Sequence, residues 1–255
     1  MSASEEIAAA IATLDELTRR LRRECPWDRE QDERSIVPHT VEEAYELADA
    51  AQRGDDDKLA DELGDVLFQV HFLSLLLEER GAGDMAQVAD LCHAKLVRRH
   101  PHVFGELEVE GAGEVLRNWD KIKQAEPGRE GGIFGEVPEN LPGPLYARKM
   151  QRRAATSGFD WPDAEGPLAS VEEELGEVRE AVGDREASFD EVGDLLFAAV
   201  SVARKLKVDP EIALRSAADR FRSRVERAAE LAAQEGLTWD ELTPEEQIGL
   251  YSRSR

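Results

Sequence analysis

The sequence predicts an all-α protein made of two consecutive helical domains. Apolar residues recur at intervals of three and four along most of the chain, and no alternating stretch is long enough to form a useful strand. Prolines and glycines, which do not continue a helix, are concentrated in residues 126–144. Motifs that precede this stretch return after it in the same order. We therefore expect a first helical domain over residues 1–125, a linker over residues 126–144 and a second helical domain over residues 145–255.

The first domain is expected to contain several amphipathic helices. Helical periodicity covers residues 5–23, 41–53, 57–80, 84–99 and 113–126. From Leu63 onward the third of these helices is apolar on all sides, which is typical of a helix enclosed by others. The stripe that holds Glu62 and Asp65 continues as Gln69 and Phe72, so both acids are expected to face the protein interior.

The chain contains the same series of motifs twice. In the first copy they are "LDELTRRLRRECPWD", "VEEAYEL" and "DELGDVLF". In the second copy they are "LYARKMQRRAATSGFDWP", "VEEELGEV" and "DEVGDLLF". The separation between matching positions decreases slowly along the chain, as expected for two diverged copies that differ by small loop deletions. A tandem repeat of two similar helical bundles explains this pattern.

Composition and charge exclude several classes of protein. The 255 residues include 55 acidic and 32 basic side chains, a formal net charge of -23, which argues against a protein that binds nucleic acid through its phosphates. The longest apolar run, residues 66–77, is shorter than the ~20 residues of a membrane span and is interrupted by polar side chains. No export signal is visible, and Cys25 and Cys92 are too isolated for a disulfide framework. We expect a soluble, cytoplasmic protein with neither a nucleic-acid nor a membrane partner.

Each copy carries an acidic pattern on two adjacent predicted helices. Glu-Glu-x-x-Glu on one helix precedes Glu-x-x-Asp on the next, and residues three apart share one helix face at ~5–6 Å. Convergent carboxylates repel one another and resist burial in their ionised form, so a divalent cation is needed to hold them together. Because the pattern offers only oxygen ligands, Mg²⁺ or Mn²⁺ is favoured over Zn²⁺. The acids are Glu42, Glu43, Glu46, Glu62 and Asp65 in the first copy and Glu173, Glu174, Glu177, Glu191 and Asp194 in the second.

Two simpler explanations compete with a metal site. In a chain this acidic, a single Glu-Glu-x-x-Glu run is commonly a solvated helix face. In addition, Thr40 with Glu43 and Ser170 with Glu173 both match the capping box of a helix N-terminus. However, Glu43 corresponds to Glu174 in the repeat rather than to Glu173, so capping would involve non-equivalent acids in the two copies. The doubled pattern therefore favours the metal site.

Three short motifs, together with the repeat, are characteristic of one family. They are "EEAYE" followed by "DELGD", then "CPWD" (Cys25–Asp28) and "KLVRRHPHVF" (Lys95–Phe104). With them the chain resembles the MazG family of all-α nucleoside triphosphate pyrophosphohydrolases over nearly its whole length. The resemblance implies two MazG-like helical bundles, hydrolysis of a nucleoside triphosphate to monophosphate and pyrophosphate, Mg²⁺ dependence, and a homodimer with interlocked helices. Mn²⁺ is a possible substitute for Mg²⁺.

The resemblance also assigns a role to each acid of the pattern. The implied metal ligands are Glu43, Glu46, Glu62 and Asp65 in the first copy and Glu174, Glu177, Glu191 and Asp194 in the second. Glu42 and Glu173 remain as groups beside the ligands or as general bases, and the sequence does not separate these two roles.

Candidate substrate-binding residues accompany the acids. The basic side chains expected to hold phosphate are Lys58, Lys95, Arg98, Arg99 and Lys123 in the first copy and Arg220, Arg222 and Arg224 in the second. Trp27 and Trp161 are candidates for the walls of base pockets, although an isolated tryptophan is more often part of a core. Lys58 lies one helical turn before Glu62, whereas the second copy has Ala187 at that place. The first copy is therefore expected to contribute at least as much catalysis as the second.

The expected reaction is attack on the α-phosphorus of a nucleoside triphosphate. No GxxxxGK[ST] loop for γ-phosphate chemistry is present in the sequence. The alternative class is a helical metal-binding module that docks a partner without turnover, and a narrower dUTPase-like hydrolase is a further alternative. A hydrolase needs the metal for turnover but keeps its fold without it, whereas a module with a structural metal unfolds when stripped of the ion.

Overall fold

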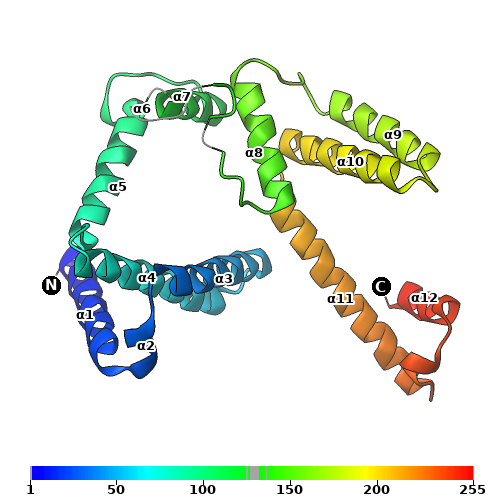
Figure 1. Cartoon of the computed structure of the whole chain (residues 1–255), viewed down its shortest axis with the longest axis horizontal. Helices are drawn as coiled ribbons and strands as arrows, with labels where there is room; N and C mark the ends of the chain where they lie inside the picture. The colour runs from blue at the N-terminus through cyan, green and yellow to red at the C-terminus, as the bar shows by residue number, and fades with distance from the viewer. Residues whose placement is uncertain (1, 125, 127–131, 136, 255) are drawn as a thin grey trace. The chain divides into compact units, whose positions relative to one another are not determined.

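Every regular element of the computed structural model is helical within the part of the chain that it describes, residues 2–124, 126, 132–135 and 137–254 (Figure 1). The all-α prediction is therefore confirmed. The chain divides into two compact units, Met1–Trp119 and Asp120–Arg255. This division falls a few residues before the predicted linker, part of which lies outside the described residues. Among the described helices, none is long and apolar enough to cross a membrane.

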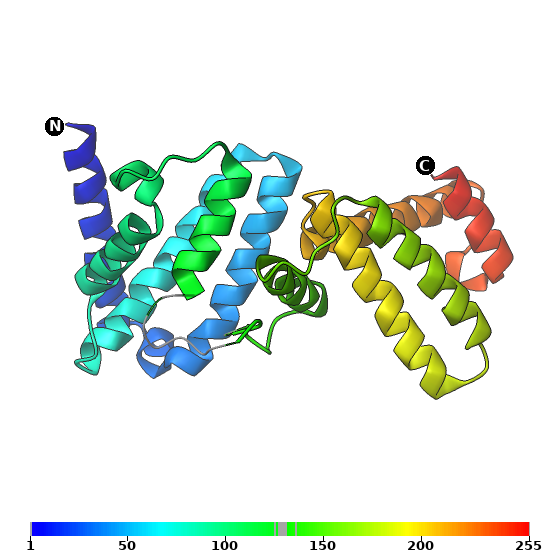
Figure 2. The ribbon, with the colours of Figure 1, turned by 90° about the horizontal axis from the view of Figure 1, so that it is seen from above.

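The first unit is organised around a pair of adjacent helices, α3 and α4. Its helices are α1 (Ala3–Glu24), α2 (Pro26–Glu30), α3 (Glu33–Arg53), α4 (Asp56–Glu79), α5 (Met85–Arg99), α6 (Pro101–Phe104) and the beginning of α7 (Ala112–Gln124). Between α3 and α4 the chain turns at Gly54, whose left-handed backbone (φ 67°) favours glycine. The Asp55 side chain then caps α4 by accepting a hydrogen bond from the backbone N–H of Lys58 at 3.0 Å. α3 and α4 consequently lie side by side, and α1 and α5 contact α4 (Figure 2).

The helix α3 begins earlier than its periodicity predicts. Its N-terminus is at Glu33 rather than at residue 41, because the Asp32 side chain accepts hydrogen bonds from the backbone N–H groups of Arg34 and Ser35. Thr40 therefore lies inside the helix, and the capping box suggested for it is wrong. The same holds for Ser170, which lies inside α9 (Glu165–Glu180). Capping does not account for the acidic pattern in either copy.

The core of the first unit lies between α3 and α4. Ile36, Phe72 and Leu76 are buried together there. Glu62 on α4 is also buried, as the apolar stripe predicts, but Asp65 is exposed and Leu63 keeps 51% of its surface accessible. We expected other helices to enclose α4 on all sides. Within a single chain this expectation is wrong, because the neighbouring helices cover only part of the α4 surface.

The second unit also contains a pair of adjacent helices with flanking helices. Its elements are α8 (Gly143–Thr156), α9 (Glu165–Glu180), α10 (Arg185–Lys205), α11 (Pro210–Gln234), the 3-10 helix η1 (Trp239–Glu241) and α12 (Pro244–Arg253). α9 and α10 lie side by side, and α8 packs against α10 and α11 (Figure 1). A separate small core joins the far end of α11 to α12 through Ala228, Ala232 and Leu250.

Candidate metal centre

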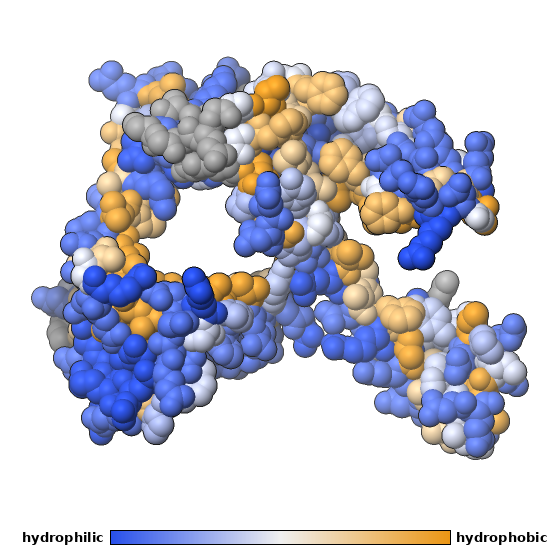
Figure 3. Space-filling view, in the orientation of Figure 1, coloured by the Kyte–Doolittle hydropathy of each residue, from blue (hydrophilic) through white to orange (hydrophobic). Residues whose placement is uncertain are grey.

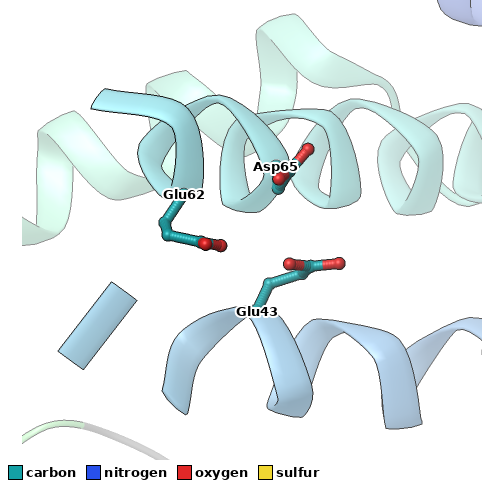
Figure 4. A group of neighbouring side chains, drawn as sticks. All are labelled: Glu43, Glu62 and Asp65. Atoms are coloured by element: carbon teal, nitrogen blue, oxygen red, sulfur yellow. The ribbon is translucent and has the colours of Figure 1, made fainter. Parts of the chain in front are cut away.

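Three carboxylates of the first copy converge between α3 and α4. Glu43 on α3 and Glu62 and Asp65 on α4 each place a carboxylate oxygen within 4.8 Å of the others. Figure 4 shows the two side chains of α4 facing Glu43 across the space between the helices. Spacing along α4 puts Glu62 and Asp65 on one face, and the α3–α4 turn brings Glu43 opposite them. The arrangement combines distant parts of the sequence into one acidic cluster.

The centre of this cluster is the Glu62 carboxylate, which is fully buried. Lys58 Nζ lies 2.5 Å from its Oε1 and 3.2 Å from Asp61 Oδ2. The other oxygen, Oε2, has no hydrogen-bond partner among the described residues. A buried carboxylate oxygen without a partner costs free energy, and a cation with oxygen preference offsets that cost. The residues therefore fit a hard divalent ion such as Mg²⁺.

Burial and neighbouring charge disfavour ionisation in the first cluster. The pKa of Glu43 is raised, first by burial and then by the charges of Asp65 and Glu46. The pKa of Glu46 is also raised, chiefly by the charge of Glu62. Glu46 thus lies close enough to interact with the cluster, although it does not belong to the set of oxygens within 4.8 Å.

The second unit holds another carboxylate cluster between α9 and α10. Here Glu174, Glu177 and Glu191 bring carboxylate oxygens within 4.8 Å of one another. Burial raises the pKa of Glu174, with the charges of Glu177 and Asp194 as further causes. Burial likewise raises the pKa of Glu191, followed by its contact with Glu177. Each cluster contains three of the four predicted ligands, and the fourth, Glu46 or Asp194, lies beside it.

A cleft of about 460 Å³ adjoins the first cluster. It is lined by Glu42, Tyr45, Glu46, Asp49, Ala50, Arg53, Asp55, Lys58 and Glu62. Glu42 is exposed, and its Oε2 lies 3.7 Å from Nδ1 of His39. Asp49 and Arg53, which form an ion pair at 2.9 Å, were missed by the sequence reasoning. Their helical spacing from Glu46 could have identified them as continuing its face. In the second unit Glu173 is likewise exposed beside its cluster.

The structure does not gather all predicted cations at the acids. Lys95 and Arg98 are exposed on α5, whereas Arg99 is buried with its guanidinium 5.1 Å from the centre of the Trp119 ring. Lys123 lies beyond the end of the first unit. The contribution of these side chains to phosphate binding stays a prediction.

The predicted cations of the second copy lie along α11. Arg220 donates to Ser216 Oγ at 2.7 Å, and Arg222 pairs with Asp219 at 3.1 Å. Arg224 stacks on the ring of Tyr251 at 4.0 Å and donates to its backbone oxygen. Arg224 is thus engaged by α12 in this chain, and its role toward a phosphate stays a prediction.

The two tryptophans predicted for base pockets have different surroundings. Trp27 is half-exposed and meets His39 edge-on, with ring centres 5.8 Å apart. Trp161 is also half-exposed but lines a cavity of the second unit, together with Phe159 and Phe197. The prediction of a cavity wall is thus matched for Trp161.

The raised pKa values link metal binding to stability. A carboxyl group whose pKa is raised by folding stabilises the fold below its unfolded pKa, and this contribution is lost as pH rises through the folded pKa. The pKa of Glu43 and that of Glu174 are raised by folding, so the metal-free protein loses stability as pH rises through these values. We expect Mg²⁺ to raise the melting temperature of the metal-free protein more at about pH 7.5 than at about pH 5, because ligand carboxylates must be deprotonated.

Differential scanning fluorimetry in titrations of Mg²⁺ measures this difference. A Glu62→Gln/Glu191→Gln variant is the control, since it removes one ligand from each cluster and should show a smaller gain. An equal gain in melting temperature at both pH values would count against carboxylate ligands.

A family model described as "MazG nucleotide pyrophosphohydrolase domain" matches residues 31–104, which include α3 and α4 and the first cluster. The chain is 42% identical over 228 residues to a Thermotoga maritima protein named "Nucleoside triphosphate pyrophosphohydrolase/pyrophosphatase MazG", covering 89% of this chain and 87% of that protein. It is 41% identical over 219 residues to the "Nucleoside triphosphate pyrophosphohydrolase" of Escherichia coli K12, covering 84% and 83% respectively. It is also 37% identical to Bacillus subtilis YabN over 235 residues, which span 91% of this chain and 48% of YabN.

Proposed function

Because the chain belongs to the MazG family, we infer that it is a nucleoside triphosphate pyrophosphohydrolase, which releases a nucleoside monophosphate and pyrophosphate. The observation that carries this function is the pair of carboxylate clusters, within a chain similar to named pyrophosphohydrolases along most of its length. A triphosphate is repelled by a protein with a net charge of -23, so cleavage of its anhydride needs a local source of positive charge.

We propose that Mg²⁺ is the cofactor. Glu43, Glu62 and Asp65 would hold it in the first unit, and the second cluster would hold it in the second unit. When bound, the ion supplies positive charge that stabilises the charge developing on the phosphate during displacement. Oxygen-only donors support this assignment, as does the buried Oε2 of Glu62, which has no hydrogen-bond partner among the described residues.

The remaining side chains of the cleft would orient the reactants. Glu42 stands exposed on the cleft wall beside Glu46, where it would accept the proton of the attacking water. Glu173 would take the same role in the second unit. Lys58, whose ammonium is held by Glu62 and Asp61, would donate to a phosphate oxygen from the opposite wall.

A tandem repeat and a homodimer belong to the same proposal. The contacts of α4 with α1, α3 and α5 are paralleled by contacts of α10 with α8, α9 and α11, which supports a duplicated bundle. Apolar side chains stay half-exposed on both central helices, such as Leu63 on α4 and Leu196 on α10. A second copy of the chain would cover such faces, in keeping with the expected interlocked dimer.

The products test the reaction directly. With each common ribonucleoside and deoxyribonucleoside triphosphate, we expect monophosphate and pyrophosphate in equal amounts, because the attack falls on the α-phosphorus. Anion-exchange chromatography of the early time course separates these products, and chelation of the metal should stop their formation. Diphosphate and orthophosphate as primary products would refute α-phosphorus attack.

A further inference from the structure

The second unit contains an aromatic cavity of about 650 Å³ beside α8 and α10. Its aromatic side chains are Phe134, Tyr146, Phe159, Trp161 and Phe197. In Figure 3 apolar side chains gather over the region where these two helices meet. A cavity of this size and lining is typical of a site for a small planar ligand, since stacking on aromatic rings accepts any flat heterocycle.

One wall of the cavity carries an unpaired hydrogen-bond acceptor. Gln151 on α8 is only 7% exposed, and its Nε2 donates to the backbone oxygen of Phe197 at 2.8 Å. This bond settles the orientation of the amide, because only its nitrogen can donate. Gln151 Oε1 is buried and has no hydrogen-bond partner among the described residues. A buried acceptor without a donor is costly, so a ligand that supplies the donor would be bound preferentially.

A second wall carries an unpaired donor. Arg204 on α10 donates from one terminal nitrogen to Asp160 Oδ1 at 2.6 Å, and Lys205 donates to Asp160 Oδ2 at 2.8 Å. Although burial alone would raise the pKa of Asp160, these hydrogen bonds outweigh it and lower the pKa. The ionised carboxylate therefore fixes the guanidinium, whose Nε is buried and has no partner within the described part of the chain. An acceptor and a donor thus line the same cavity.

The ring of Trp161 is held in place by its neighbours. A Cβ atom at Gly166 would lie 2.3 Å from Cε3 of Trp161, so the ring packs where only glycine leaves room. Lys205 also donates to the backbone oxygen of Trp161. The aromatic wall is consequently preorganised, which reduces the entropic cost of ligand binding.

The cavity begins close to the second carboxylate cluster. Phe197 follows Glu191, the member of the cluster on α10, by six residues, an axial rise of ~9 Å, and Asp194 lies between them. The cavity and the acids therefore share one helix and belong to one unit. A ligand with a planar group and a polyphosphate can occupy both.

We propose that this cavity binds the base of the nucleotide, with Gln151 Oε1 accepting from an exocyclic amino group and Arg204 Nε donating to the adjacent ring nitrogen. The proposal rests on the proposed pyrophosphohydrolase function and adds a specificity determinant to it. Adenine, cytosine and guanine carry such an amino group, whereas uracil and thymine do not. Nucleotides with an amino-bearing base are therefore the preferred substrates of the second unit.

The test compares ATP with purine riboside triphosphate, which lacks only the amino group. It uses the full chain carrying Glu62→Gln, so that the second cluster is measured, and the nearly isosteric change Gln151→Met. With Gln151 present, kcat/KM for ATP should exceed that for the analogue by about tenfold, and with methionine the two should agree within about twofold. Calorimetry with α,β-methylene-ATP, which is not cleaved between the α- and β-phosphates, should show about tenfold weaker binding to Gln151→Met.

Two further variants keep the test decisive. Gln247→Met is the matched control, because Gln247 also donates to a backbone oxygen of the second unit, that of Trp239 at 2.9 Å, but does not line the cavity. Gln247→Met should leave the preference for ATP over purine riboside triphosphate unchanged. Phe159→Leu changes a residue that is 84% exposed at the cavity, so it should spare the fold and weaken binding of ATP and its analogue alike.

Three outcomes would overturn the proposal. The first is that Gln151→Met lowers kcat/KM by the same factor for ATP and for purine riboside triphosphate. The second is that UTP binds as tightly as ATP, and the third is that Phe159→Leu binds ATP as tightly as the chain without this change. Failure of the proposed function is a different result, namely no pyrophosphate from any triphosphate with the wild-type chain. If circular dichroism shows that Gln151→Met is unfolded, the measurements on Phe159→Leu and on UTP still test whether the cavity binds the base.

Discussion

Replacing Glu62 and Glu191 together by glutamine is expected to lower pyrophosphate release at least about a thousandfold, with wild-type helix content. Both residues belong to their carboxylate clusters. Glutamine keeps the shape of the side chain but removes the charge that attracts the cation. The factor corresponds to several kcal/mol of lost transition-state stabilisation. Glutamine at residue 62 loses the ion pair with Lys58, but the Lys58 side chain is half-exposed and water can solvate its ammonium. Because Glu62 is fully buried, removing its charge also removes a desolvation cost, so the fold should not weaken.

Initial rates at saturating Mg²⁺ and far-ultraviolet circular dichroism measure these two quantities. The matched control is Glu16→Gln/Glu180→Gln, which makes the same change in charge at two exposed positions outside the clusters and should keep its activity. If the cluster variant retained more than about a tenth of the wild-type rate, the assignment of the clusters to catalysis would be wrong.

Single variants are expected to show that the second unit contributes most of the turnover. Glu177→Gln should remove most pyrophosphate release, whereas Glu46→Gln should leave most of it. From sequence alone, Lys58 favoured the first copy, but its ammonium lies 2.5 Å from Glu62 and there competes with a cation for the same oxygen. In the second unit Ala187 replaces it, and the aromatic cavity adjoins the cluster. The structure therefore gives a reason to expect more turnover from the second unit than from the first.

Steady-state rates of the two single variants, measured with the same triphosphate, show which unit contributes more turnover. The combined Glu46→Gln/Glu177→Gln variant should be inactive and serves as the lower limit. A Glu46→Gln variant that loses most of its activity, beside a nearly intact Glu177→Gln variant, would place catalysis in the first unit instead.

Sequence by itself determined the helices and the acids that they carry. Helical spacing is a local property, so periodicity was sufficient to predict the all-α fold and to put Glu62 and Asp65 on one face of α4. The repeated motifs identified the equivalent acids of the second copy in the same way. Short-range rules also show which residues could cap a helix, but they do not decide where a helix begins. Asp32 rather than Thr40 starts α3.

Only the tertiary structure decided which of these side chains are buried, paired or close together. The apolar stripe predicted burial for both Glu62 and Asp65, but Asp65 is exposed, because its exposure depends on how much of α4 the neighbouring helices cover. The same applies to the unpaired Gln151 and Arg204, because their cavity combines segments from Phe134 to Arg204. Contacts between distant segments follow from three-dimensional packing, and these contacts, rather than the motifs, set the charge and hydrogen-bonding state of each site.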